Sequence, residues 1–161
     1  MTPIIELGMT AKDTVTGFTG IVIAKYEYLY GCSHYFIQPK INDKRKIVEG
    51  QTLDEYQIEI IDTEKKCLPV YIMEVPIVEL GVTAVDNLTG LVGVVMARYL
   101  FISGSVRYAL QPEMEEGEEE YPKSFTCDGP HVEVIVNEDF KRSRNLCYHN
   151  GKYLSYICIF K

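Results

Sequence analysis

One segment of this chain is repeated, and the repeat restricts the fold more than any other feature. Residues 4–39 recur as residues 77–112 without a gap, and about half of the aligned positions carry the same amino acid. Identity this high over this length indicates a duplication. Two copies are too few for a solenoid, in which at least three units must stack to bury a core. The repeat therefore predicts two tandem small domains or one pseudo-symmetric unit.

Each copy has the residue types of short β-strands. β-branched and aromatic residues follow a Thr-Gly-x-x-Gly turn, and a proline, which cannot donate to a β-ladder, ends the return strand. We expect strands at 21–29, 33–38 and 56–61 in the first copy and at 106–111 and 131–136 in the second. Four or five short strands in about 60 residues predict an all-β chain of two tandem, pseudo-symmetric SH3-like barrels, with small open antiparallel sheets as the alternative.

Outside the aligned segments the chain supplies a linker and a tail. We divide it into a first β repeat at 1–62, a linker at 63–76, a second β repeat at 77–136 and a C-terminal hairpin extension at 137–161. The linker is short and partly apolar, so we expect it to pack and to hold the two copies in a fixed relation.

The extension carries the pair Asn150-Gly151, which is favoured in a type I′ hairpin turn. The second strand of this hairpin is too apolar to be left in water. We therefore expect it to pair with a barrel edge, either of its own chain or of another protomer. The second case would make the protein a homo-oligomer.

The composition argues against several classes of function. The chain has 161 residues, a formal net charge of −7 and no apolar run near the roughly 20 residues of a membrane span. A general nucleic-acid binder needs a basic surface. The first residues lack the basic and apolar regions of a signal peptide, and five cysteines without a C-x-x-C pair are typical of reduced thiols. We expect a cytoplasmic protein with no membrane partner and no general nucleic-acid partner.

Two aspartates occupy the same place in each copy, three residues before a Thr-Gly pair. Asp13 and Asp86 could do acid/base chemistry, or each could accept backbone N–H groups within its turn. A shared position in duplicated turns favours the second interpretation. The segment Gly17–Gly20 looks like a phosphate loop, but no Gly-Lys-Ser/Thr and no helix follow it, so we expect a β-turn.

Cys32 and His34 are a candidate pair of metal ligands or a candidate nucleophile and base. The second copy has Ser105 and Arg107 at these positions. Zinc needs four clustered ligands at a recognisable spacing, and two positions apart on a strand only places two side chains on one face. The sequence therefore predicts no metal site, no cofactor and no catalytic residue, so we expect a protein that is not an enzyme.

A ligand-binding surface is the sharper hypothesis. His34 and Arg107 are equivalent, and each precedes a tyrosine, so they could receive an anion while aromatic rings stack on a base. The alternative is that most of these tyrosines are half-buried barrel residues with a solvated hydroxyl group. The candidate ligand-binding residues are Tyr26, Tyr28, His34, Tyr35, Arg98, Arg107 and Tyr108.

The loops after the return strands carry opposite charges. Residues 40–46 are basic and residues 113–120 are acidic. Such runs are usually solvated loops, but opposite signs at equivalent places would also suit head-to-tail association or docking on a basic protein. The candidate partner-binding residues are Glu115, Glu116, Glu118, Glu119 and Glu120.

Part of each copy is similar to a known group of proteins. The pattern is D-x-x-T-G-F-x-G, then Y-L-x-G-C-x-x-Y, then Q-P, and the first copy matches it at 13–20, 28–35 and 38–39. The second copy departs from it at Leu91, at Phe101-Ile102 and at Ser105. With this pattern each copy resembles small phage and prophage proteins. The resemblance implies a phage or mobile-element origin, a reduced bacterial cytoplasm and no catalytic residue.

Together these observations favour a non-enzymatic protein that acts inside the bacterial cell against a host defence. In the first hypothesis it sequesters a small nucleotide-derived immune signal. In the alternative it blocks a host defence nuclease or effector by direct contact, with the acidic loop imitating the charge of nucleic acid. A third hypothesis is a virion or assembly component.

Overall fold

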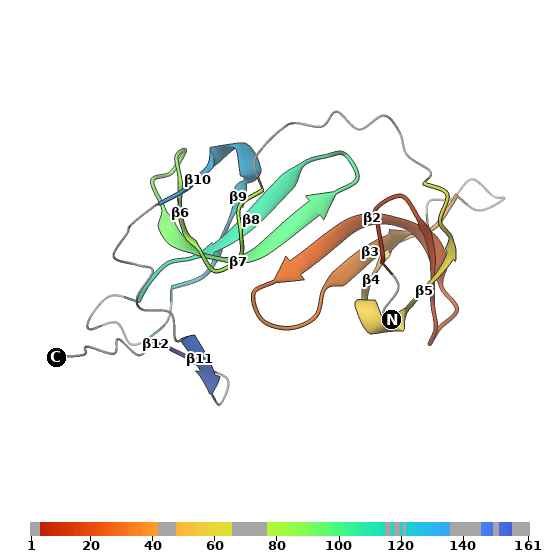
Figure 1. Cartoon of the computed structure of the whole chain (residues 1–161), viewed down its shortest axis with the longest axis horizontal. Coiled ribbons are helices and arrows are strands. Elements are labelled where there is room, and N and C mark those ends of the chain that lie inside the picture. The colour runs from red at the N-terminus through yellow and green to blue at the C-terminus, as the bar shows by residue number, and fades with distance from the viewer. Residues whose placement is uncertain are drawn as a thin grey trace.

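A computed structural model describes residues 4–41, 48–65, 77–114, 117, 120, 122–135, 146–149 and 152–155. Within these residues the chain is all β apart from two short 3-10 turns, η1 (Glu55–Gln57) and η2 (Gly129–His131). Ten strands form one antiparallel sheet and two more form a separate hairpin (Figure 1). No helix in the described part of the chain is long and apolar enough to cross a membrane.

The two repeats contain the same series of strands. The first has β1 (Thr10–Asp13), β2 (Thr19–Tyr28), β3 (His34–Gln38), β4 (Gln51–Asp54) and β5 (Ile58–Asp62). The second has β6 (Thr83–Asp86), β7 (Val92–Phe101), β8 (Val106–Gln111), β9 (Phe125–Asp128) and β10 (Val132–Val134). The strands expected from the sequence are therefore present, with ends that differ by a few residues.

Within each repeat the sheet is open. The order is β5-β1-β2-β3-β4 in the first repeat and β10-β6-β7-β8-β9 in the second. The 3-10 turns η1 and η2 connect the two outer strands of each repeat, β4 to β5 and β9 to β10, but no ladder pairs these outer strands among the described residues. The prediction of an all-β chain is confirmed, whereas closure of each sheet into a barrel is not observed.

Each repeat has its own apolar core, built from equivalent positions. Residues of β2 and β7 are buried alternately up to a β-bulge in each strand, between Val22 and Ala24 and between Val95 and Ala97. The bulge shifts the alternation, so Val22 and Val95 face the cores while Tyr26 and Tyr99 face the opposite side. The core residues are Ile5, Ala11, Val22, Tyr35, Ile37, Leu53 and Ile58 in the first repeat and Val78, Ala84, Val95, Tyr108, Leu110 and Cys127 in the second. Gly20 is required because a Cβ there would lie 2.5 Å from the Gln38 carbonyl oxygen.

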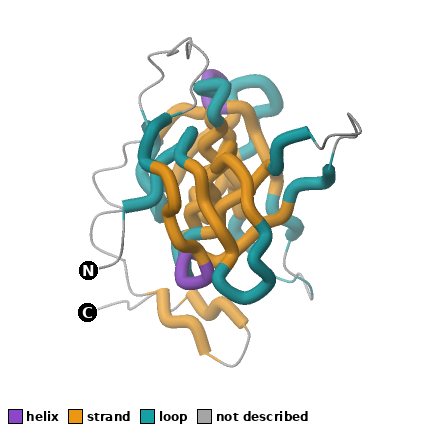
Figure 2. Tube along the Cα trace, turned by 90° about the vertical axis from the view of Figure 1, so that its right-hand side faces the viewer, coloured by secondary structure: helices purple, strands orange, loops and turns teal. Residues whose placement is uncertain are grey.

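The repeats are joined by direct pairing of β2 with β7. Tyr26 lies opposite its own equivalent, Tyr99, so a pseudo-two-fold axis passes through this pair. Two backbone hydrogen bonds repeat the symmetry: Leu29 N–H donates to the Met96 carbonyl and Ile102 N–H donates to the Ile23 carbonyl, both at 2.8 Å. The ten strands thus form one continuous body, with η1 and η2 at opposite ends (Figure 2).

We expected the linker to hold the two copies in a fixed relative position, but a β-ladder between the copies does so. This ladder joins β2 to β7 and is a set of backbone hydrogen bonds between the repeats. The linker residues 66–76, to which we assigned this role, lie outside the described residues. The structure is therefore one pseudo-symmetric unit across its centre.

The C-terminal hairpin is confirmed. β11 (Leu146–His149) pairs with β12 (Lys152–Ser155), and His149 lies opposite Lys152, which leaves a two-residue connection. Among the described strands this hairpin pairs only with itself. Residues 156–160 lie outside the described part, so pairing of the apolar strand with a sheet edge stays a prediction.

Candidate functional site

The two duplicated aspartates support turns. The Asp13 carboxylate accepts the N–H of Val15 at 3.0 Å and of Thr16 at 3.2 Å, and also the Thr16 hydroxyl. Asp86 accepts the Thr89 hydroxyl at 2.6 Å. These hydrogen bonds, led by those from the threonine hydroxyls, lower the pKa of both aspartates. The Asx-turn interpretation is confirmed, and the two carboxylates are committed to the scaffold.

The β2–β7 junction has two faces with different chemistry. Residues directly opposite one another on adjacent strands point to the same side of a sheet. His34 lies opposite Tyr26, Tyr26 opposite Tyr99, and Tyr99 opposite Arg107. These four side chains therefore share one face. Tyr35, Tyr108 and Arg98 belong to the other face, so the seven candidate ligand-binding residues do not form a single cluster.

The first face carries a contiguous group of rings, which we call the aromatic face: Tyr26, Tyr28, Tyr99 and Phe101. The Tyr26 and Tyr99 rings meet edge to face at 5.5 Å, and the Tyr26–Phe101 and Tyr28–Tyr99 pairs lie at 6.4 Å. All four rings are partly exposed. Burial raises the pKa of the three tyrosines, so their hydroxyl groups are neutral donors at neutral pH.

Equivalent side chains flank the aromatic face on both sides. In the first repeat His34 Nε2 lies 2.6 Å from Asp54 Oδ1, and the His34 ring stands edge-on to Tyr28 at 5.3 Å. In the second repeat Arg107 Nε donates to Asp128 Oδ1 at 2.7 Å, with its guanidinium 6.0 Å from the Phe101 ring. The face is thus bordered by one imidazole–carboxylate pair and one guanidinium–carboxylate pair.

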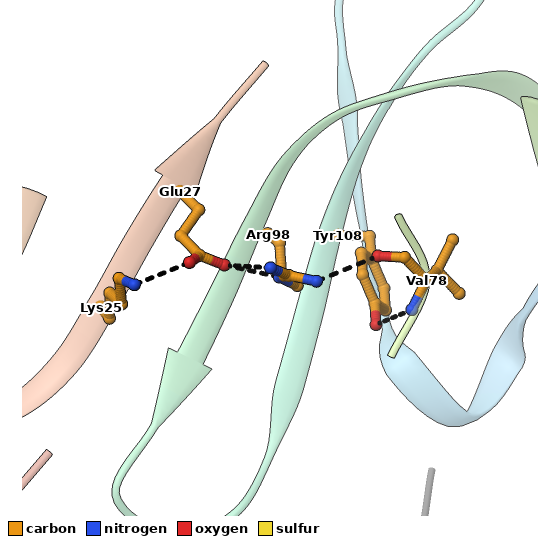
Figure 3. Close-up of polar contacts among 5 residues, drawn as sticks. All are labelled: Lys25, Glu27, Val78, Arg98 and Tyr108. Atoms are coloured by element: carbon orange, nitrogen blue, oxygen red, sulfur yellow. Dashed lines mark hydrogen bonds and ion pairs between the residues drawn. The ribbon is translucent and has the colours of Figure 1, made fainter. Parts of the chain in front are cut away.

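The opposite face of the junction is a chain of polar contacts (Figure 3). Glu27 receives Lys25 Nζ at 2.8 Å on one oxygen and Arg98 on the other, with Arg98 Nε at 2.6 Å. Arg98 Nη1 also donates to the Val78 carbonyl at 3.4 Å. Burial by itself raises the pKa of Glu27, but hydrogen bonds from Lys25 and Arg98 outweigh it and hold that pKa below its usual value. Arg98 is therefore engaged across the junction.

Tyr35 and Tyr108 lie in the two cores. Tyr108 is fully buried, and its hydroxyl oxygen accepts the Val78 N–H at 2.9 Å. Tyr35 is 4% exposed, and Lys25 Nζ lies 5.8 Å from the centre of its ring. Of the seven candidates, the structure brings Tyr26, Tyr28, His34 and Arg107 to the aromatic face and places Arg98, Tyr35 and Tyr108 behind it.

The seven candidates predicted from the sequence do not include Tyr99, Phe101, Asp54 or Asp128. The repeat alignment holds a signal for Phe101, because it is the equivalent of Tyr28. The two aspartates also occupy matching segments, since Thr52-x-Asp54 before Ile58-Glu59 recurs as Thr126-x-Asp128 before Val132-Glu133, but this match lies outside the aligned residues 4–39 and 77–112. They come from β4 and β9, and only the register of the sheet sets them opposite His34 and Arg107.

The charged loops lie largely outside the described residues. Four of the five candidate partner-binding glutamates, Glu115, Glu116, Glu118 and Glu119, lie outside the described residues, and Glu120 is exposed. The bases of the two loops are described and match. Gln38 Nε2 donates to the Val48 carbonyl at 2.7 Å, and Gln111 Nε2 donates to the Pro122 carbonyl at 2.6 Å. Each Gln-Pro pair thus closes its loop.

A shallow groove of about 340 Å³ lies at the outer edge of the second repeat. It is lined by apolar residues such as Val82 and Val132, with Glu79 and Glu133 at its polar side. None of the described residues that line this groove is basic, so none of them offers a positive charge to a phosphate. The aromatic face is the better candidate for a binding site.

Comparisons of the chain with protein-family models, with curated proteins and with solved structures find no match.

Proposed function

We propose that this protein is a non-enzymatic binding protein whose aromatic face holds a small nucleotide-derived signal molecule. The observation that carries the proposal is the continuity of Tyr26, Tyr28, Tyr99 and Phe101 across the repeat junction, between His34 and Arg107. Aromatic side chains on a sheet bind bases of any sequence because every base has a π-face. The five-strand order of each repeat also supports our interpretation of the repeats as SH3-like modules.

Arg107 is the residue best suited to meet a phosphate. Its side chain is 54% exposed and that of Asp128 is 58% exposed, and an ion pair this exposed is worth at most about 1 kcal/mol. Arg107 can therefore exchange Asp128 for a phosphate at little cost. Arg98 cannot do so equally well, because its side chain and that of Glu27 are only 19% and 17% exposed.

The biological role follows from the sequence resemblance and from the chemistry of the face. A phage-type protein that stacks a base and binds phosphates without a catalytic group would remove a nucleotide signal from a host defence by sequestration. In this proposal the protein works in the bacterial cytoplasm and acts by occupancy, so its effect depends on its concentration relative to the signal.

Native mass spectrometry tests the proposal directly. The protein is purified from cells with an active nucleotide-signalling defence, and bound molecules are released by heat and identified. We expect a nucleotide at stoichiometric mass. Loss of one stacking ring costs about 1–3 kcal/mol per base, so Tyr99→Ala should weaken binding by roughly 5- to 150-fold. Arg107→Ala should weaken it as well, while Lys40→Ala removes an exposed positive charge elsewhere and serves as the control.

An empty protein that also fails to bind added cyclic and linear nucleotides would contradict the proposal. The inhibitor hypothesis would then take precedence, and replacement of Glu115, Glu116, Glu118 and Glu119 by Gln would be its first test.

A further inference from the structure

Three potential metal ligands converge at the border of the aromatic face in the first repeat. They are Cys32, His34 and Asp54, and their ligand atoms all lie within 4.8 Å of one another. His34 and Asp54 lie directly opposite each other on β3 and β4. Cys32 sits in the turn after Gly31, whose φ of 106° lets the chain reverse. The Ser33 carbonyl accepts the Glu55 N–H at 3.1 Å, which ties this turn to the end of β4.

The distances are close to those of a tetrahedral zinc site. With Zn–S near 2.3 Å and Zn–N and Zn–O near 2.1 Å, neighbouring ligand atoms are separated by about 3.4–3.6 Å. Cys32 Sγ lies 3.9 Å from Asp54 Oδ1, and His34 Nε2 lies 2.6 Å from the same oxygen. Each of these two distances differs from the tetrahedral value by less than about 1 Å, and no two of the three ligand atoms lie more than 4.8 Å apart.

The second repeat has the same strands and turn but carries different side chains at two of the three ligand positions. Ser105 and Arg107 stand at the positions of Cys32 and His34, and Asp128 stands at that of Asp54. There the guanidinium of Arg107 supplies the positive charge next to the carboxylate. In the first repeat the carboxylate faces a thiol and an imidazole, two soft or borderline donors that suit Zn²⁺ and its neighbours.

We propose that Cys32, His34 and Asp54 form a binding site for a divalent transition-metal ion of the zinc type. Binding requires the thiolate and the neutral imidazole, so Cys32 and any protonated His34 release their protons to solvent. The His34 and Asp54 side chains are 34% and 49% exposed, which leaves the fourth coordination position open to water or to a ligand atom. The site shares His34 with the border of the aromatic face, but its test does not depend on nucleotide binding, because the metal alone is the probe.

Titration of the intact protein with Co²⁺ provides the test. Tetrahedral cobalt gives intense visible bands, and a thiolate ligand adds a charge-transfer band in the near ultraviolet. We expect both, at one equivalent per chain, and displacement of the bands by Zn²⁺. Because loss of an outer-shell partner already costs 10- to 100-fold in metal affinity, Cys32→Ser should weaken binding by at least about 100-fold and remove the charge-transfer band.

The duplication offers a matched pair of control variants. C32S/H34R gives the first repeat the residues that the second repeat already carries on the same frame, so it should fold and lose the metal. S105C/R107H transfers the ligand set to the second repeat and should raise the stoichiometry to two. The buried thiol of Cys127 is a poor competitor, since burial raises its pKa to about 11.

Absence of the charge-transfer band in the intact protein would overturn the proposal. So would a C32S/H34R variant that is folded, as judged by circular dichroism, and binds Co²⁺ as tightly as the intact protein. Either result would reduce the cluster to an ordinary His34–Asp54 pair.

Discussion

The two repeats share a core and differ at its border. Tyr35 and Tyr108, Val22 and Val95, and the aligned alanines are buried in equal ways. The exposed or half-exposed positions have diverged, as the replacement of His34 by Arg107 shows. A close-packed core tolerates few changes of volume, whereas a surface side chain can change with little cost in stability. Core positions have exchanged one apolar residue for another, as in Ile37 and Leu110, whereas positions at the border of the core have changed their charge or polarity.

The two copies also differ in the charged residues that hold the β2–β7 junction together. Arg98 is the equivalent of Lys25, and Leu100 is the equivalent of Glu27. Only one of the two symmetric places thus holds a carboxylate, and that carboxylate receives both cations. The backbone pairing at this interface is pseudo-symmetric, but its charged side chains are not. The first repeat supplies the carboxylate, and each repeat supplies one cation.

The largest effect should come from removal of this carboxylate. Glu27→Leu leaves Lys25 and Arg98 partly buried without their shared anion, which should lower the free energy of unfolding by about 3 kcal/mol. The register sets Lys25 opposite Leu100, so E27L/L100E moves the carboxylate to the symmetric place and should recover much of the loss. Urea unfolding of the three proteins measures both effects. A double variant no more stable than Glu27→Leu would show that the pseudo-symmetry does not extend to these side chains.

Substitutions in the two Asx turns should have smaller effects on stability, and the two effects should differ in size. Asp13→Asn and Asp86→Asn each weaken hydrogen bonds that favour an ionised carboxylate, so both should lower the melting temperature. Asp13 accepts the backbone N–H of Val15 at 3.0 Å, against 3.3 Å for Leu88 at Asp86, so we expect the larger decrease for Asp13→Asn. Differential scanning calorimetry would show the order, and equal decreases would mean that the turns have not diverged.

The same carboxylates set the response to acid. The folded-state pKa of Asp13, Asp86 and Glu27 is lowered, so their contribution to stability is present above their unfolded pKa values, near 4, and is lost as the pH falls through the folded values. The pKa of Lys25 is raised: burial alone would lower it, but Glu27 outweighs burial. Its contribution is therefore present below its unfolded pKa and is lost only as the pH rises through the folded value.

Unfolding measured between pH 2 and pH 7 should therefore show stability that decreases below about pH 4. Glu27→Gln should make this decrease shallower, because one of the three linked groups no longer titrates. Parallel curves for the variant and the intact protein would contradict the assigned role of Glu27.

The smallest effect should be at the border of the aromatic face. Arg107→Ala breaks an exposed ion pair and should change the free energy of unfolding by less than about 1 kcal/mol. Arg98→Ala, at the equivalent of Lys25, should cost clearly more because its pair with Glu27 is largely buried. Chemical denaturation of the two variants distinguishes an arginine in an exposed ion pair from one in a largely buried ion pair. Equal losses would remove the basis for that distinction.

Much of the local structure could be read from the sequence because it depends on short-range chemistry. The positive φ of Gly17 and Gly90, the Asp13 and Asp86 turns and the two-residue hairpin connection all follow from residues a few positions apart. The duplication repeated the glycine and aspartate signals, whereas the hairpin signal occurs once, in the C-terminal extension. An Asx turn or an Asn-Gly hairpin needs no partner elsewhere in the chain, so its pattern is sufficient.

The candidate site could be predicted only in part. His34 and Arg107 were identified from their equivalence, but their carboxylate partners lie 20 or more positions away in sequence. Side chains alternate between the two faces of a strand, and this placed the predicted ligand-binding residues on different faces. Tyr35 immediately follows His34, yet it points into the core. Adjacent residues of a strand face opposite sides, so nearness in sequence does not predict a shared surface.

The amino-acid sequence therefore established the duplicated β frame, its turns and the aromatic character of its long strands, all of which depend on composition and spacing. Pairing of β2 with β7, the split of the tyrosines between core and surface, and the meeting of Cys32, His34 and Asp54 came from the folded chain. These features depend on register between strands that are distant in sequence. A shift of one residue in that register would send every side chain to the opposite face, so local preference alone does not specify it.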